Sequence, residues 1–166
     1  YYNSNYEDRT SVIVLPTGTG KTGLITILPF GISEGRVLII TPQLTIKDGV
    51  LKALSEGVDN FLLKQKVIED PNLLPQVIEY SKDTRNTLPE ADIVVLNIHK
   101  LQSRLEHTLL NKVNENYFDM IIIDEAHHST AQTWIEAVNY FKNAKVIKLT
   151  GTPFRSDNEP IRGKEI

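Results

Sequence analysis

Cysteine is absent from the 166-residue sequence. This absence excludes a disulfide-stabilised scaffold and any metal site built on thiolate ligands. No apolar run approaches the roughly 18 residues that a membrane-spanning helix needs, and no signal peptide opens the sequence. We therefore expect a soluble, cytoplasmic domain without membrane attachment.

An excess of one charge sign is also missing. The sequence has 18 Lys and Arg against 21 Asp and Glu, which gives a net charge of −3. Proteins that coat nucleic acid through bulk charge usually carry a basic excess, so that class is disfavoured, whereas a local basic groove is compatible with the composition. The apolar content of 40% is ordinary for a globular protein, and the length favours one domain.

Short apolar runs rich in Val and Ile recur along the chain and lead into Gly, Thr, Pro or acidic residues. Because the runs lack polar alternation, they are typical of strands that a parallel sheet buries on both faces under helices. The predicted strands cover residues 12–15, Val37–Thr41, 91–97, Met120–Ile123 and Lys145–Thr150.

Helical periodicity lies between these runs. One apolar stripe with spacings of three and four predicts a helix that Ser129 or Thr130 caps, and a second stripe advances in four-residue steps. Alternating strands and helices predict an α/β domain of three layers with a mainly parallel central sheet. The first stripe is Ala131, Trp134, Ile135, Val138 and Phe141, and the second is Leu101, Leu105, Leu109 and Val113.

The segment between residues 61 and 90 is less regular. Residues 61–68 and 76–80 are compatible with short strands, and two prolines interrupt the chain between them. Residues 82–90 are compatible with a loop.

A glycine-rich segment, residues 16–22 (PTGTGKT), joins the first predicted strand to an apolar helical segment. Strand, loop and helix in this order are the context of a phosphate-binding loop (P-loop), whose glycines let backbone N–H groups point at phosphate oxygens. Lys21 would reach the β- and γ-phosphates, and the Thr22 hydroxyl would hold Mg²⁺. Because Leu15 stands where the strict pattern has its first Gly, a plain turn with a solvated Lys21 is the alternative. The predicted nucleotide-binding residues are Thr17, Gly18, Thr19, Gly20, Lys21 and Thr22.

Two carboxylates, Asp124 and Glu125, follow directly on the apolar run Met120–Ile123. In P-loop domains the first typically coordinates Mg²⁺, and the second orients and deprotonates the attacking water. The strand order of such a sheet would bring Asp124 near the phosphate-binding loop, although the pair alone is also compatible with a solvated turn. His127 and His128 do not favour zinc, because adjacent side chains point apart and no cysteine supplies a third ligand.

These motifs resemble those of the first motor domain of the superfamily-two helicases and translocases, the DEAD/DEAH-box-like group. The resemblance covers nearly the whole chain and implies a RecA-like P-loop NTPase fold. The matching segments are motif I at 15–22 (LPTGTGKT), motif Ia at 41–49 (TPQLTIKDG), motif Ib at 96–102 (LNIHKLQ), the DEAH box at 124–127 and motif III at 149–155 (LTGTPFR).

The resemblance implies ATP and Mg²⁺ as cofactors. The metal would be held by Thr22 and Asp124, and the catalytic residues would be Lys21, Asp124, Glu125 and His127. The segment with which the family recognises adenine carries a glutamine, and no glutamine occurs in residues 1–10. Specificity for ATP therefore depends on the resemblance alone.

Motif III implies two further roles. Thr150 and Thr152 would couple the nucleotide state to the nucleic-acid site, although both hydroxyls could instead form a turn around Gly151 and Pro153. The sequence Thr-Gly-Thr-Pro, together with the second His after the DEAH box, is similar to the branch of type I and type III restriction subunits and excision-repair helicases. This similarity favours duplex DNA over RNA.

Polar side chains also follow two other predicted strands, at the sheet edge where such domains bind ligands. They would hold a phosphate backbone without reading the base sequence, although each cation could equally be a solvated helix residue. The candidate nucleic-acid contacts are Thr41, Pro42, Gln43, Lys47, His99, Lys100 and Arg104.

The resemblance therefore implies the ATP-binding half of a DNA helicase or translocase. We expect this domain to cover residues 1–154, truncated upstream, and residues 155–166 to begin a linker to an absent second RecA-like domain of the same parent chain. Because that domain supplies an arginine finger, the monomeric fragment alone should hydrolyse ATP poorly. The alternatives are an RNA-directed helicase of the same superfamily and a nucleotide-gated scaffold. A P-loop NTPase of another class is disfavoured, because neither a transporter signature loop nor a kinase lid is evident.

Overall fold

The computed structural model describes residues 9–16, 18–55, 57, 60–81, 83–101, 108–124, 131–151 and 164–165. Its centre is a sheet in the order β3-β4-β2-β5-β6-β1-β7, and every strand pairing is parallel. The carboxyl ends of the strands therefore lie at one edge of the sheet. The strands are β1 (Thr10–Val14), β2 (Val37–Thr41), β3 (Val77–Glu79), β4 (Ile93–Asn97), β5 (Met120–Ile123), β6 (Lys145–Thr150) and the two-residue β7 (Lys164–Glu165).

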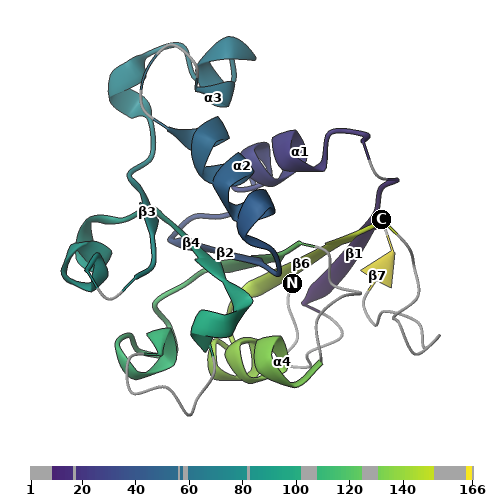
Figure 1. Ribbon diagram of the computed structural model, residues 1–166, viewed down its shortest axis with the longest axis vertical. Coiled ribbons are helices and arrows are strands. Elements are labelled where there is room, and N and C mark those ends of the chain that lie inside the picture. The colour runs from purple at the N-terminus through teal and green to yellow at the C-terminus, as the bar shows by residue number, and fades with distance from the viewer. Residues whose placement is uncertain are drawn as a thin grey trace.

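Helices cover both faces of the sheet, as Figure 1 shows. One face carries α1 (Lys21–Ile27), α2 (Leu44–Leu54) and the single turn α3 (Phe61–Lys64), and the other face carries α4 (Ala131–Tyr140). Short 3₁₀ turns complete the connections. They are η1 (Pro71–Leu73), η2 (Arg85–Glu90), η3 (Ile98–Leu101) and η4 (Leu109–Asn111). The three-layer α/β prediction and its five strands are confirmed.

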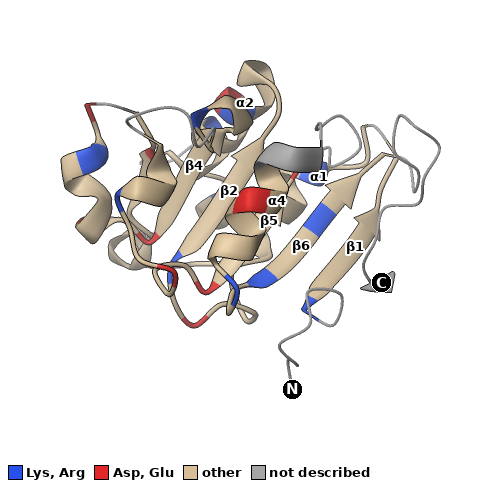
Figure 2. Ribbon diagram, turned by 90° about the horizontal axis from the view of Figure 1, so that it is seen from below, with Lys and Arg blue, Asp and Glu red and all other residues tan. Residues whose placement is uncertain are grey.

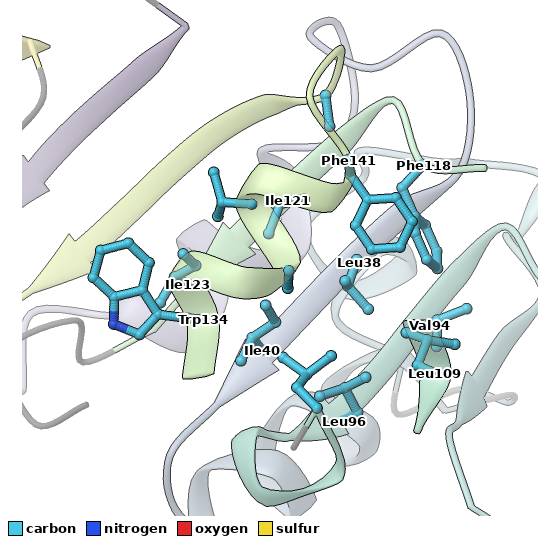
Figure 3. Close-up of a cluster of buried hydrophobic side chains, with 14 of the residues drawn as sticks. Leu38, Ile40, Val94, Leu96, Leu109, Phe118, Ile121, Ile123, Trp134 and Phe141 are labelled. Carbon is cyan, nitrogen blue, oxygen red and sulfur yellow. The ribbon is translucent and has the colours of Figure 1, made fainter. Parts of the chain in front are cut away.

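The strands are apolar throughout because they separate two hydrophobic cores. In β2, Leu38 and Ile40 pack with the core under α4, whereas Val37 and Ile39 pack with the core under α1 and α2. Figure 3 shows the α4 side, where Phe141 meets Phe118 and the strand residues. Burial on both faces explains why periodicity-free runs were sufficient to predict these strands.

The predicted strand at 61–68 is wrong, since Phe61–Lys64 form the helical turn α3 and residues 65–68 continue as turn and irregular backbone. The Asn60 side chain accepts hydrogen bonds from the N–H groups of Leu62 and Leu63, at 2.8 and 3.4 Å, and so caps this turn. The strand expected at 76–80 is confirmed as the edge strand β3, and the loop expected at 82–90 contains η2.

The second helical stripe does not form one helix. Leu101 ends η3, Leu109 begins η4, and the extended backbone of Thr108 (ψ 146°) separates η4 from what precedes it. Leu101, Leu109 and Val113 are nevertheless buried in the core under α4, so the pattern identified core residues in the wrong local structure. Leu105, Ser129 and Thr130 lie outside the described residues.

The amino end of β1 is fastened to the carboxyl end of α4. The buried Arg9 guanidinium donates to the carbonyl oxygens of Val138 (2.7 Å), Phe141 (3.2 Å) and Ala144 (2.7 Å). These acceptors belong to the last turn of α4 and the residues after it, where carbonyl groups lack helical partners. Arg9 therefore joins the outer part of the sheet to its covering helix.

The ends of the chain are described in part. Within residues 155–166 the structure describes only β7, which pairs with β1 next to Ser11 and Val12. The linker and the boundary at residue 154 stay predictions. Among the described residues, no helix combines the length and apolar character needed to span a membrane.

Candidate functional site

The loop between β1 and α1 lies at the carboxyl edge of the sheet. Gly18 (φ 85°) and Gly20 (φ 94°) both adopt left-handed backbone conformations that L-residues rarely occupy. A Cβ atom at either position would meet nothing within 4 Å, so backbone conformation and not space requires glycine there. The Thr19 hydroxyl donates to the Pro16 carbonyl (2.6 Å), which closes the turn, and residues 18–20 are exposed. The loop is thus a solvent-exposed turn directly before α1.

Lys21 and Asp124 come together across this edge, although 103 residues separate them in the sequence. Asp124 follows β5, its side chain is 4% exposed, and its backbone N–H donates to the Ile40 carbonyl (3.0 Å). Burial raises the pKa of the Asp124 carboxyl to about 6, and the ammonium of Lys21 opposes this shift. Thr22 stands beside Lys21 in the first turn of α1 and is half-buried.

These side chains suit Mg²⁺. Carboxylate and hydroxyl oxygens are hard ligands, and Mg²⁺ is usually held by one or two carboxylates together with substrate phosphates. No group of three or more His, Cys, Asp or Glu side chains that could bind a metal occurs within the described ranges. The chemistry therefore fits a cation shared between Asp124, Thr22 and a phosphate.

Thr150 brings motif III to the same edge. Its side chain is fully buried at the end of β6, and its carbonyl accepts a hydrogen bond from the Leu15 N–H (2.8 Å) at the start of the glycine-rich loop. The predicted residues Thr17, Arg104, Glu125, His127 and Thr152 lie outside the described part of the chain.

The side chains of two candidate nucleic-acid contacts are buried, and their role stays a prediction. The Thr41 side chain is fully buried, and its hydroxyl donates inward to the Leu96 carbonyl (3.4 Å). Lys47 is 8% exposed, and its ammonium contacts the carboxylates of Glu79 and, at 3.4 Å, Asp48. The hydrogen bond to Glu79 raises the pKa of Lys47. Neither side chain presents a free polar group to a polymer.

The other described candidates lie at the ends of the neighbouring strands β2 and β4. Gln43, His99 and Lys100 are exposed, and Pro42 is half-buried. Asn97, which is 7% exposed, connects the two loops: its side-chain N–H donates to the Pro42 carbonyl (3.2 Å), and its side-chain oxygen accepts from the His99 N–H (3.1 Å). The orienting role of Asn97 was missed from sequence, because the signal is only a polar residue at the end of an apolar strand.

Charge does not single out this surface. Figure 2 shows acidic and basic residues interspersed over the described ribbon. The polar loops after β2 and β4 are therefore recognised by their position at the carboxyl edge, beside the glycine-rich loop in the same parallel sheet.

Three solved structures and curated relatives relate this domain to known proteins. The chain is similar to the Hef helicase domain of Pyrococcus furiosus, with a TM-score of 0.63 and 18% identity over 98% of this chain and 36% of that one. It is also similar to the UvsW helicase of bacteriophage T4 (TM-score 0.56, 21% identity, 88% of this chain and 48% of that chain). For a hypothetical ATP-dependent RNA helicase of Sulfolobus tokodaii, the TM-score is 0.58 and the identity 21%, over 95% and 48%.

The curated relatives match over a shorter segment. An uncharacterised protein of Mycobacterium leprae is 34% identical over 87 residues, which are 50% of this chain. The match spans 14% of that relative's length.

A family model covers most of the chain. The model of the type III restriction enzyme res subunit matches residues 3–155, which include both the glycine-rich loop and Asp124. The helicase structures share the all-parallel sheet with flanking helices. The chain belongs to the type III restriction enzyme res-subunit family of superfamily-two helicases, as its first RecA-like, ATP-binding domain.

Proposed function

We propose that this domain binds and hydrolyses ATP with Mg²⁺ to drive a helicase or translocase along duplex DNA. The observation that carries the proposal is the meeting of Lys21 and the buried Asp124 beside the left-handed glycine loop. Membership of the family supports a helicase or translocase domain, and the polymer and the role of each residue are proposed here.

The nucleotide chemistry divides among four residues. The Lys21 ammonium would offset charge on the β- and γ-phosphates, and Asp124 with Thr22 would hold Mg²⁺, which stabilises charge at the transferred phosphoryl group. Glu125 would accept the proton of the attacking water. Its place directly after Asp124 in the sequence supports this assignment.

Coupling to nucleic acid would use motif III. Thr150 supports this role, because its backbone joins the end of β6 to the start of the nucleotide loop. His127 and Thr152 would exchange hydrogen bonds as the nucleotide changes state.

Nucleic acid would lie across the loops after β2 and β4. Gln43, His99 and Lys100 are exposed there, and Asn97 fixes the two loops to each other. Such polar and cationic groups would hold phosphates without sequence readout. A restriction-enzyme family and the Thr-Gly-Thr-Pro motif favour DNA. The similarity to the hypothetical RNA helicase of Sulfolobus tokodaii keeps RNA as the second candidate.

The test compares ATP turnover by the full-length protein with no polymer, duplex DNA, single-stranded DNA and RNA, using Lys21→Ala as the blank. Duplex DNA should stimulate turnover most. Preference for RNA would overturn the substrate, and turnover indifferent to every polymer would favour the nucleotide-gated scaffold. Glu125→Gln should stall the enzyme with ATP bound, whereas a non-hydrolysing scaffold would behave unchanged.

A pair of alanine variants tests the proposed surface. Lys100→Ala should weaken DNA binding and reduce its salt dependence, because one phosphate contact is lost. Lys112→Ala is the matched control, since Lys112 is also exposed but lies beside Arg85 and Leu88 of η2, which precedes β4. Equal effects of the two changes would exclude a specific role for Lys100.

A further inference from the structure

Lys148 is a lysine in the interior of the sheet. Its side chain is 1% exposed, although lysine is rarely buried to this extent. In β6 it stands between Val12 of β1 and Ile123 of β5, and both neighbours belong to the core under α4. An apolar side chain would satisfy the packing at this position, so burial of a cation calls for another explanation.

The Lys148 ammonium lies over the ring of Trp134, 4.5 Å from its centroid. This geometry is a cation–π contact, which is strongest where water is excluded. Trp134 is 6% exposed and belongs to the first turn of α4; Figure 3 shows it beside Ile123. The contact therefore fastens the start of α4 to β6.

Trp134 also has a buried polar group, its indole N–H. Its indole N–H finds no hydrogen-bond acceptor among the described residues, whereas buried donors in proteins are normally paired. An aromatic residue chosen only to fill the core would not need this group. The indole is thus a second polar feature at the position where Lys148 is buried.

The pair lies next to the residues of the proposed reaction. Lys148 is in register with Ile123, one residue before Asp124, and it precedes Thr150 by two residues on the same strand. α4 begins at Ala131, directly after the segment that contains Glu125 and His127 in the sequence. The Lys148–Trp134 contact thus joins the strand of motif III to the helix that follows the acidic motif, residues 124–127 in the sequence.

We propose that Lys148 and Trp134 are positioning residues, which hold the start of α4, and with it the acidic motif, in register with the end of β6 for ATP hydrolysis. Lys21 begins α1, and Asp124 follows Ile122 of the core under α1 and α2 by two residues, whereas Lys148 lies over Trp134 of α4. The pair consequently acts through placement of the acidic motif. This inference depends on the proposed ATPase function.

The test uses Lys148→Met, which keeps the length of the side chain and removes its charge, and Lys148→Arg, which restores a cation. In the full-length protein with saturating DNA, Lys148→Met should lower kcat at least about tenfold with little change in nucleotide affinity, because a misplaced catalytic group slows the chemical step. Lys148→Arg should recover part of kcat, and Trp134→Leu should match Lys148→Met.

Val138→Ala is the matched control, because Val138 is fully buried in the same α4 core but lies at the other end of α4, where its carbonyl accepts from Arg9 before the amino end of β1. It should lower the melting temperature and leave kcat unchanged well below that temperature. If Lys148→Met keeps kcat within twofold, or if both variants lose kcat in proportion to stability, the pair is structural only and the proposal is wrong.

A direct readout of the pair is available because Trp134 is the single tryptophan of the sequence. Lys148→Met should change the fluorescence emission of folded protein, and Val138→Ala should not. Unchanged emission in Lys148→Met would show that the contact does not form and would overturn the proposal. Wild-type protein that binds no nucleotide would instead overturn the proposed function, and this inference with it.

Discussion

Asp124 shows, at the scale of a single residue, how a binding site opposes folding. Its carboxylate is almost completely buried at the end of β5, and burial raises its pKa while Lys21 compensates only in part. A bound cation would remove this penalty, because it supplies the opposite charge inside the fold. The Asp124 carboxylate is therefore more favourable in the cation-bound protein than in the free protein.

Replacing Asp124 by Asn should therefore stabilise the free chain and weaken Mg²⁺-dependent nucleotide binding. The folded-state pKa of about 6 exceeds the ordinary value of 3.8, so wild-type stability should fall as pH rises from about 4 to about 6 and then level off. The free energy of unfolding of Asp124→Asn should exceed that of wild type by at most about 3 kcal/mol at pH 8, and the difference should vanish near pH 4. Chemical denaturation without Mg²⁺ at both pH values measures this difference. If Asp124→Asn were less stable than wild type at pH 8, burial of the Asp124 carboxylate would not oppose folding.

Two glycines in helices provide a matched comparison. A Cβ at Gly23 of α1 would lie 2.8 Å from the Phe61 ring, whereas a Cβ at Gly49 of α2 would meet nothing within 4 Å. Gly49→Ala should raise stability by about 0.5–1 kcal/mol through helix propensity alone. Gly23→Ala should lose that gain, because Phe61 must move away from α1. Equal stabilisation of the two variants in thermal unfolding would show that Phe61 does not pack on α1.

At the scale of elements, side chains from other parts of the chain hold α4 at both of its ends. Lys148 contacts its first turn, and Arg9 binds the carbonyl groups at its last turn. Arg36 offers a comparison, because its guanidinium also donates to carbonyl groups, those of Pro89 (3.0 Å) and Ala91 (3.2 Å), but it is less buried. The cost of losing such hydrogen bonds rises with burial of the acceptors.

Arg9→Met should consequently destabilise the chain by about 2–3 kcal/mol, because three carbonyl groups lose a charged donor. Arg36→Met should cost less. Urea denaturation of the two variants ranks them, and a loss in Arg9→Met no larger than that in Arg36→Met would contradict the role of Arg9 at the end of α4.

The elements also show what could be predicted from sequence. β1, β2, β4, β5 and β6 were predicted correctly because strands buried on both faces leave uninterrupted apolar runs. α3 was missed because one side chain, that of Asn60, determines a single turn. Four-residue spacing around Leu109 indicated burial correctly and helix wrongly, since Leu101 and Leu109 reach the core from separate 3₁₀ turns.

The candidate site was predictable where a motif determines backbone conformation, as at Gly18 and Gly20. It was not predictable where contacts with distant parts of the chain determine whether a side chain is exposed. Glu79, 32 residues from Lys47, contacts its ammonium, and the exposure of a lysine cannot be read from its neighbours in the sequence. Lys148 was likewise included in an apolar strand, and its burial and its position over Trp134 became evident from the structure.

At the scale of the whole molecule, the carboxyl edge of one parallel sheet gathers the nucleotide loop, Asp124, motif III and the exposed loops after β2 and β4. Helicase homologues have a second motor domain in addition to such a domain, and the resemblance implies that the second domain supplies an arginine finger. The isolated chain should therefore bind Mg²⁺–ATP but turn it over at least about a thousandfold more slowly than the full-length protein, as expected without an arginine finger. Comparable kcat values for the two would contradict the two-domain account.

The most direct test of the central claim is the Mg²⁺-dependent affinity of the full-length protein for a fluorescent ATP analogue, measured in wild type, Lys21→Ala, Asp124→Asn and the surface control Lys112→Ala. Wild type and the control should bind with equal affinity and only weakly without Mg²⁺. Lys21→Ala and Asp124→Asn should each weaken binding at least about tenfold, and the double variant should lose less than the sum, because the two groups hold one ligand. Wild-type affinity in either single variant would show that Lys21 and Asp124 do not form a nucleotide site.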